Sequence, residues 1–234
     1  NDPVASPDAD PGDGTGGITG TGVAVGPITG FGSVIVNGVT YDTSSATFTQ
    51  DGVPATQSDF AVGQVVLVTG TIDDSTTGTA DTVTFDDNVD GPVSSVDDVV
   101  HSFIVLGQTV FVSATTSFDD SCPATLDELL GVAAVEVSGP VRADGSIEAS
   151  RIECKTVAGE LEVTGIVSNL DTGAMTFQVN ALVVDYSGAV LDNVPSAGVV
   201  SNGDPVEAKG NTLGGGGELT ATRVEYKGGQ FAND

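Results

Sequence analysis

The sequence is poor in several residue types that particular functions require. Its 234 residues include no tryptophan, one methionine, one histidine, two cysteines and only six lysines and arginines. Neutralising nucleic-acid phosphates requires clustered basic side chains, so the chain lacks the surface of a nucleic-acid-binding protein. A single histidine excludes a metal site built from several histidines of one chain. The sequence has no apolar run of about 18 residues, so no transmembrane helix is predicted.

Acidic residues dominate the charge of the chain. The 33 aspartates and glutamates give a formal net charge of -27, yet only 17% of residues are charged and 39% are hydrophobic. This hydrophobic content is ordinary for a folded protein and argues against a disordered acidic chain. The chain is rich in Thr, Ser, Gly and Val, and its start at Asn1 resembles a processed end. We therefore expect an exported bacterial protein, extracellular or at the cell surface, whose signal peptide has been removed.

Four landmarks recur three times in the same order, roughly 65–74 residues apart. Each repeat opens with Gly-x-Ile/Val, continues with an apolar strand and a tight turn, reaches a small-x-Gly element, and ends with a strand that starts with Ala. The openings begin at Gly26, Gly91 and Gly165; the turns are Asn37-Gly38, Leu106-Gly107 and Asn180-Ala181; the small-x-Gly elements end at Gly70, Gly139 and Gly210; the last strands start at Ala80, Ala149 and Ala221. Ordered landmarks in three copies indicate an internal triplication.

Short runs of Val, Ile, Thr, Phe and Tyr alternate with polar residues and predict an all-β fold. About five strands per repeat, with a loop or short helix between the third and fourth, predict three tandem small OB-like five-stranded barrels. Small β-sandwiches are the alternative. One short helix is expected at residues 125–130, where Thr125 and Glu128 have capping-box spacing. The predicted segments are a Gly/Asp-rich N-terminal leader (1–22), three β-repeats (23–89, 90–157 and 158–229) and a tail (230–234).

Two blocks of the first repeat carry a family resemblance. They are GPITGFGSVIVNGVTY at residues 26–41 and VGQVVLVTG at residues 62–70. These blocks resemble a bacterial domain family of unknown function, whose members are exported proteins and lipoproteins with tandem modules. The resemblance is specific in the first repeat, clear in the second and faint in the third. It implies an exported modular protein and supplies no catalytic residues.

The two cysteines, Cys122 and Cys154, fall in the same repeat. In an exported protein such a pair is expected to form a disulfide. The alternative is two separate buried thiols, each packed as a small hydrophobic residue.

A calcium-binding loop is a second candidate site. Asp86, Asn88 and Asp90 alternate in front of Gly91, and Asp97 follows five residues later. This spacing matches the oxygen ligands of a calcium loop, although Asp97 stands where a glutamate is usual and no helices flank the segment. Each repeat opens with a glycine, so Gly91 is also explained without a metal. Calcium is therefore a candidate cofactor, and an acidic linker between the first two repeats is the alternative.

The sequence shows no catalytic constellation, and we expect no enzyme. Tandem β-units with an acidic surface predict a non-catalytic structural subunit of a bacterial extracellular filament, sheath or matrix, associating with itself head to tail. The leader is a candidate assembly strand, and the apolar residues expected to make assembly contacts are Ile18 in the leader and Val23 and Val25 directly after it. The alternative is a monomeric surface or periplasmic binding module, for which calcium dependence is one option.

Overall fold

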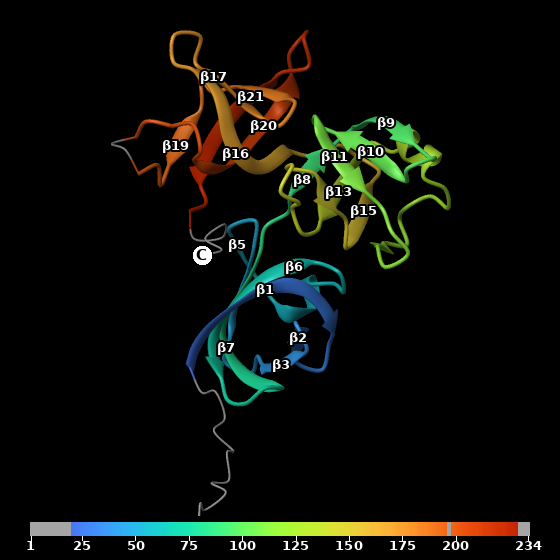
Figure 1. Ribbon diagram of the computed structural model, residues 1–234, viewed down its shortest axis with the longest axis vertical. Helices are drawn as coiled ribbons and strands as arrows, with labels where there is room; N and C mark the ends of the chain where they lie inside the picture. The colour runs from blue at the N-terminus through green and yellow to red at the C-terminus, as the bar shows by residue number, and fades with distance from the viewer. Residues whose placement is uncertain (1–19, 196–197, 229–234) are drawn as a thin grey trace, which may run out of the picture.

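The computed structural model describes residues 20–195 and 198–228, which form three units of strands and turns (Figure 1). Unit 1 spans residues 20–85, unit 2 residues 89–155 and unit 3 residues 161–226. The all-β prediction is confirmed. The first strand begins at Gly20, ahead of the predicted repeat start at residue 23. Ile18 and the tail at residues 230–234 lie outside the described residues.

Unit 1 is a closed barrel. Its elements are β1 (Gly20–Gly30), β2 (Val34–Val36), β3 (Val39–Asp42), β4 (Thr47–Gln50), β5 (Val53–Ala55), the short 3-10 helix η1 (Gln57–Asp59), β6 (Val65–Ile72) and β7 (Thr77–Phe85). Antiparallel pairing joins β1 to β2 and β6, β2 to β3, and β6 to β7. Parallel pairing of β3 with β7 closes the ring in the strand order of an OB barrel. The predicted OB-like barrel is therefore confirmed, and closure excludes the sandwich alternative.

Unit 2 repeats this order with its first and last barrel strands each split in two. Its elements are β8 (Val89–Gly91), β9 (Val93–Asp97), β10 (Ser102–Val105), β11 (Gln108–Phe111), β12 (Ser117–Phe118), the 3-10 helix η2 (Asp127–Gly131), β13 (Ala134–Ser138), β14 (Ile147–Glu148) and β15 (Arg151–Lys155). The first split falls at Pro92, which has no N–H to donate to a ladder. The helix expected at residues 125–130 is the 3-10 helix η2, which begins two residues later, at Asp127. In front of η2, the Thr125 N–H donates to Glu128 Oε2 at 3.3 Å.

Unit 3 closes in the same way as unit 1. Its strands are β16 (Leu161–Asp171), β17 (Thr176–Val179), β18 (Leu182–Asp185), β19 (Val190–Asp192), β20 (Pro205–Leu213) and β21 (Leu219–Tyr226). Each unit also holds a short strand that the sequence did not predict, lying between the third and fourth barrel strands. These strands, β4, β12 and β19, each pair in parallel with the last strand of their own unit.

Backbone geometry explains two of the repeated landmarks. The first tight turn needs positive φ at both residues, which is 51° at Asn37 and 80° at Gly38. The glycine of the small-x-Gly element lies where the fourth and fifth barrel strands approach closely. A Cβ on Gly70 would collide with the carbonyl oxygen of Thr79, and one on Gly139 would collide with that of Glu148. These positions therefore require glycine for close backbone contact.

The three units are not equally independent. Unit 1 has its own hydrophobic core, whereas the buried apolar residues of units 2 and 3 form one continuous core. Strand β8 pairs with β13 on one side and with β16 on the other, so one sheet runs through both units. The side-chain amide of Gln108 also donates to the Val179 carbonyl at 3.0 Å. Figure 1 shows units 2 and 3 side by side, with unit 1 beneath them.

Candidate functional site

Ionisable side chains from all three units lie together, buried or half-buried, where the units meet. The carboxylates are Asp51, Asp86, Asp87, Asp90, Glu136, Glu162 and Glu207, and the lysines are Lys155, Lys209 and Lys227. We call these ten residues the junction cluster. Transferring a charged group from water to the protein interior costs free energy unless the group is paired. The cluster is therefore the most unusual feature of the described residues.

Strand register creates the cluster. Asp90 of β8 lies directly opposite Glu136 of β13 on one side and Glu162 of β16 on the other. Glu162 in turn lies opposite Lys209 of β20. Three neighbouring strands therefore place three carboxylates side by side, with a lysine on the fourth strand, and such a row of carboxylates is destabilising unless cations compensate it.

Three lysines compensate part of this charge. Lys155 Nζ contacts Asp90 Oδ2 and lies 3.0 Å from Glu136 Oε2. Lys209 Nζ lies 2.6 Å from Glu162 Oε2 and 3.5 Å from Glu207 Oε2. The third lysine, Lys227, has its Nζ 3.3 Å from Asp86 Oδ1 and 3.1 Å from Glu207 Oε1. Seven carboxylates against three ammonium groups leave an excess of four negative charges when all are ionised.

The remaining carboxylates lack such compensation. Asp87 is 3% exposed, and its Oδ1 has no hydrogen-bond partner among the described residues. Burial, together with the nearby Glu162, raises the pKa of Asp87 well above its usual range. Burial also raises the pKa of Asp51 to about 6, although Lys209 opposes the shift. Both carboxyls are therefore held where a proton or a cation is favoured.

A groove gives solvent access to the cluster. It has a volume of about 490 Å³ and lies between unit 1, the segment that follows β13 in unit 2, and β16 of unit 3. Asp86 and Asp87 form the acidic part of its lining, and Thr164 lines it from unit 3. The Thr164 hydroxyl is buried without a hydrogen-bond partner in the described part of the chain. The groove and the cluster thus form a polar site between the units.

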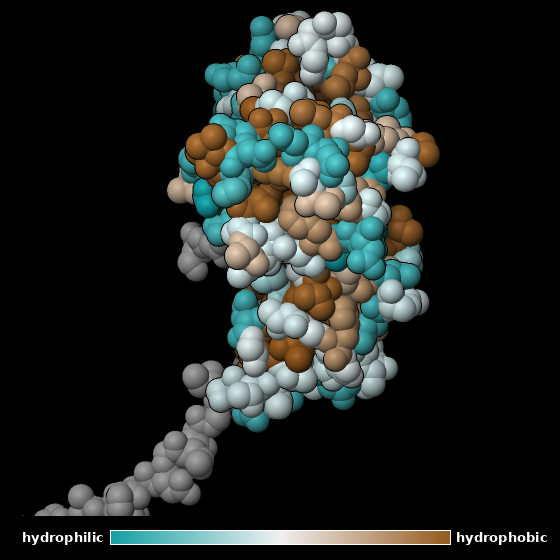
Figure 2. Space-filling view, turned by 90° about the vertical axis from the view of Figure 1, so that its right-hand side faces the viewer, coloured by the Kyte–Doolittle hydropathy of each residue, from teal (hydrophilic) through white to brown (hydrophobic). Residues whose placement is uncertain are grey.

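Unit 1 presents a different kind of surface. Residues 20–27 of β1 pair with β6, and no other described strand pairs with them. The Val25 carbonyl on the outer edge accepts from the Asn37 side-chain amide at 2.9 Å, so the edge without a strand or side-chain partner is the stretch at residues 20–24. Val23 is 70% exposed and Val25 is 46% exposed on the outer side of this strand. Across β1, β6 and β7 a single charged side chain occurs, Asp81. In the side view of Figure 2, unit 1 is the lower lobe, and brown and tan residues run through the middle of the face shown. We call β1, β6 and β7 the neutral sheet.

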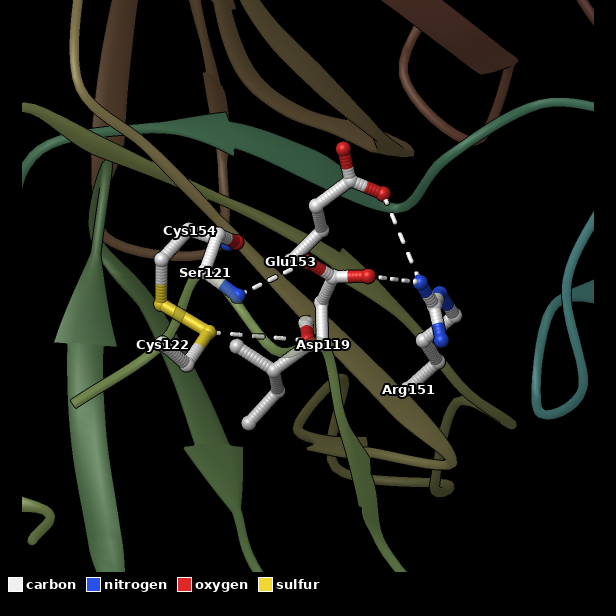
Figure 3. Close-up of a disulfide and its surroundings, with 7 residues drawn as sticks. Asp119, Ser121, Cys122, Arg151, Glu153 and Cys154 are labelled. Carbon is white, nitrogen blue, oxygen red and sulfur yellow. Dashed lines mark hydrogen bonds and ion pairs between the residues drawn. A yellow bond between two sulfur atoms is a disulfide. The ribbon is translucent and has the colours of Figure 1, made fainter. Parts of the chain in front are cut away.

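The predicted disulfide is confirmed. Cys122 and Cys154 are bonded, with their Cα atoms 4.9 Å apart (Figure 3). The bond ties the loop in front of η2 to β15. Arg151 of β15 reinforces the same contact, because its guanidinium lies 2.7 Å from Asp119 Oδ2. Figure 3 shows this ion pair beside the disulfide.

The four residues of the predicted calcium loop have other partners. Asp86 pairs with Lys227, and Asp90 pairs with Lys155. Asn88 Oδ1 accepts from the Gly139 N–H at 2.7 Å. Asp97 Oδ1 accepts from the backbone N–H groups of the turn that follows β9. The four side chains therefore contact different partners in the described residues. Of these four residues, Asp86 and Asp90 belong to the junction cluster.

The fold and the repeat define a class of protein: three OB-like barrels in tandem, joined by a buried polar junction. Residues 24–84, 90–153 and 164–225 each match a family described as a domain of unknown function, DUF5666. The chain therefore belongs to the DUF5666 family, in three tandem copies. No curated protein matches the chain. Among the described residues, no helix has the length and apolar content needed to cross a membrane.

Proposed function

We propose that this chain is a non-catalytic structural subunit of a bacterial extracellular filament, sheath or matrix, and that copies associate through unit 1. The observation that carries the proposal is the neutral sheet, with its free β1 edge and exposed Val23 and Val25. A free strand edge offers main-chain hydrogen bonds to a strand of another chain.

Charge favours this surface for contact between copies. Subunits that each carry a net charge of -27 repel one another, and the repulsion is smallest where carboxylates are fewest. The neutral sheet contains only Asp81, whereas β13, β15, β16, β20 and β21 all contain charged side chains. Apolar and main-chain contacts at the neutral sheet resist dissociation by salt, because they do not depend on opposite charges.

The occupant we assign to the free edge is the leader of a second copy. Residues 1–19 precede β1 directly and contain few apolar side chains apart from Ile18. A leader that adds to the β1 edge of the next copy makes a head-to-tail contact, and such contacts form filaments when they do not close into rings. The disulfide supports a location outside the cytoplasm, because disulfides persist in oxidising compartments.

A charge placed on the neutral sheet tests the proposal. We expect the full chain to sediment as growing oligomers with increasing concentration and to form extended particles by negative-stain electron microscopy. Val23→Glu should abolish both, because it places a carboxylate at the free edge. Val99→Glu is the matched control, since Val99 is 90% exposed on unit 2. A chain that stays monomeric at its highest soluble concentration, or a Val23→Glu variant that assembles like the control, contradicts the proposal.

A second candidate function is a surface or periplasmic binding module. It is favoured by a groove of about 550 Å³ in unit 2, lined by His101, Phe118 and Leu126. Concave sites with mixed apolar and polar lining suit small ligands. A monomeric protein whose His101 signals shift in NMR spectra on addition of a ligand mixture would favour this function over assembly.

A further inference from the structure

The junction cluster holds carboxylate oxygens that its lysines do not reach. Asp87 Oδ1, Asp90 Oδ1 and Glu162 Oε1 have no hydrogen-bond partner in the described residues. The three residues are only 3%, 6% and 5% exposed, respectively. Leaving a buried acceptor unpaired is unfavourable, and a buried carboxylate is the most costly case. These atoms therefore favour a positively charged ligand.

The spacing of the carboxylates fits a single ion. One carboxylate oxygen from each of Asp51, Asp87 and Glu162 lies within 4.8 Å of the other two. Calcium binds oxygen ligands at about 2.3–2.6 Å, so two oxygens on one ion are at most about 5 Å apart. The three side chains can therefore reach one calcium ion with little movement.

Two overlapping groups of carboxylates could hold the ion, and they differ in how far lysines compensate them. Asp87 also lies within 4.8 Å of Asp90 and Glu136, but Lys155 already bridges those two residues. Neither Asp51 nor Asp87 forms an ion pair with a lysine or arginine within the described part of the chain. The group formed by Asp51, Asp87 and Glu162 thus has the larger share of uncompensated oxygens.

We propose that the junction cluster binds one calcium ion between Asp51, Asp87 and Glu162. Asp51 follows β4 of unit 1, Asp87 lies in the linker after β7, and Glu162 belongs to β16 of unit 3. The ion ties unit 1 to unit 3 through side chains, with Lys209 holding the second oxygen of Glu162. Calcium suits this irregular carboxylate set, whereas magnesium demands a near-ideal octahedron and retains water. None of these three residues belongs to the loop predicted from sequence spacing.

Solvent access supports the site. The groove of about 490 Å³ includes Asp87 in its lining and gives a hydrated ion a path to the cluster. Because carboxyl groups bind a metal in their deprotonated form, binding releases the protons that these carboxyls carry.

Calorimetry on the full chain tests the site. Chelator-treated protein is titrated with calcium chloride in two buffers of different ionisation enthalpy, and its melting temperature is recorded with calcium or magnesium. We expect one calcium per chain, proton release, and a rise in melting temperature of ~5–10 °C at about 100 times the dissociation constant. Asp87→Asn should remove the binding, and Asp51→Asn should weaken it at least tenfold. Asp120→Asn is the matched control, since Asp120 is exposed in a loop of unit 2.

Several results would overturn the site. They are the absence of calcium binding, an equal response to magnesium, or binding by Asp87→Asn that matches the wild type. Asp87→Asn replaces a buried carboxyl by an amide of nearly the same size and should fold; if it does not, the Asp51→Asn result decides. The site goes beyond the proposed assembly and does not depend on it, because the same titration can be made on the Val23→Glu variant. Calcium binding by a monomeric variant therefore separates failure of one proposal from failure of the other.

Discussion

Replacing Lys209 by methionine should destabilise the protein strongly. Methionine retains most of the volume of the lysine stem, which is 7% exposed, but removes the ammonium group 2.6 Å from Glu162 and 3.5 Å from Glu207. Removing one partner of a buried ion pair typically costs about 3–5 kcal/mol, because the remaining charge stays buried without compensation. In this cluster the carboxylates already outnumber the lysines, so no other free cation of the cluster can replace Lys209.

The magnitude can be expressed as a melting temperature. For chains of about 150–250 residues, 1 kcal/mol shifts the melting temperature by about 2–4 °C, so the loss corresponds to ~6–20 °C. The loss should be similar at pH 5 and pH 8. Glu162, whose pKa burial raises to about 9, keeps its proton at both pH values, while Glu162, Lys227 and Lys209 together hold the pKa of Glu207 below its usual range against the effect of burial. Lys209 therefore compensates the charge of Glu207 at both pH values.

The exposed ion pair in unit 2 provides the control. Arg142 lies 3.4 Å from Glu148, with side chains 41% and 48% exposed. Exposed pairs contribute about 0–1 kcal/mol, so Arg142→Met should change the free energy of unfolding little. Urea unfolding of both variants at pH 5 and pH 8, in the presence of chelator, measures the difference. If Lys209→Met loses no more stability than Arg142→Met, the cluster is not electrostatically strained and the reasoning is wrong.

Three further predictions concern other parts of the molecule. Replacing Cys122 and Cys154 together by alanine opens a loop of 32 residues and should lower the free energy of unfolding by ~3–4 kcal/mol. A reductant should lower the melting temperature of the wild type and leave that of the double variant unchanged. The metal-free protein should lose stability as pH rises from about 4.5 to about 9, because Glu162 retains its proton in the folded state over this range and loses it in the unfolded chain. Urea unfolding at several pH values, in the presence of a chelator, measures this loss. Gly139→Ala should cost about 1–3 kcal/mol through its clash with a carbonyl oxygen, while Gly131→Ala, with open space around it, should cost nothing measurable in the same assay.

The barrel architecture could be predicted from the sequence because the repeats supply three aligned examples of one pattern. Asn37-Gly38 fixes a hairpin turn, and alternating apolar residues fix the buried face of each strand. The short strand before the fourth barrel strand cannot be predicted in this way. Segments such as β12, with only Ser117 and Phe118, are too short to show a periodic pattern, and tertiary pairing creates them.

The junction cluster could not be predicted, because its residues meet only after three units have packed. Spacing along the linker pointed to Asp86, Asn88 and Asp90, but strand pairing separates their side chains among different partners. One signal was present: Glu136 and Glu207 interrupt apolar strands at equivalent positions of the second and third repeats. An acidic residue on the buried part of a strand indicates a polar contact, although its partner cannot be identified from one strand.

The double pairing of β8 has a consequence for how the chain can be divided. Cutting after unit 1 leaves a barrel with its own core, so an isolated fragment ending near residue 85 is a sensible expression target. Cutting between units 2 and 3 instead exposes half of a common core and strips β8 of one neighbour. The three copies are therefore alike in sequence but differ as folding units. Unit 1 is one unit, and units 2 and 3 together form a second unit that should be expressed as a pair.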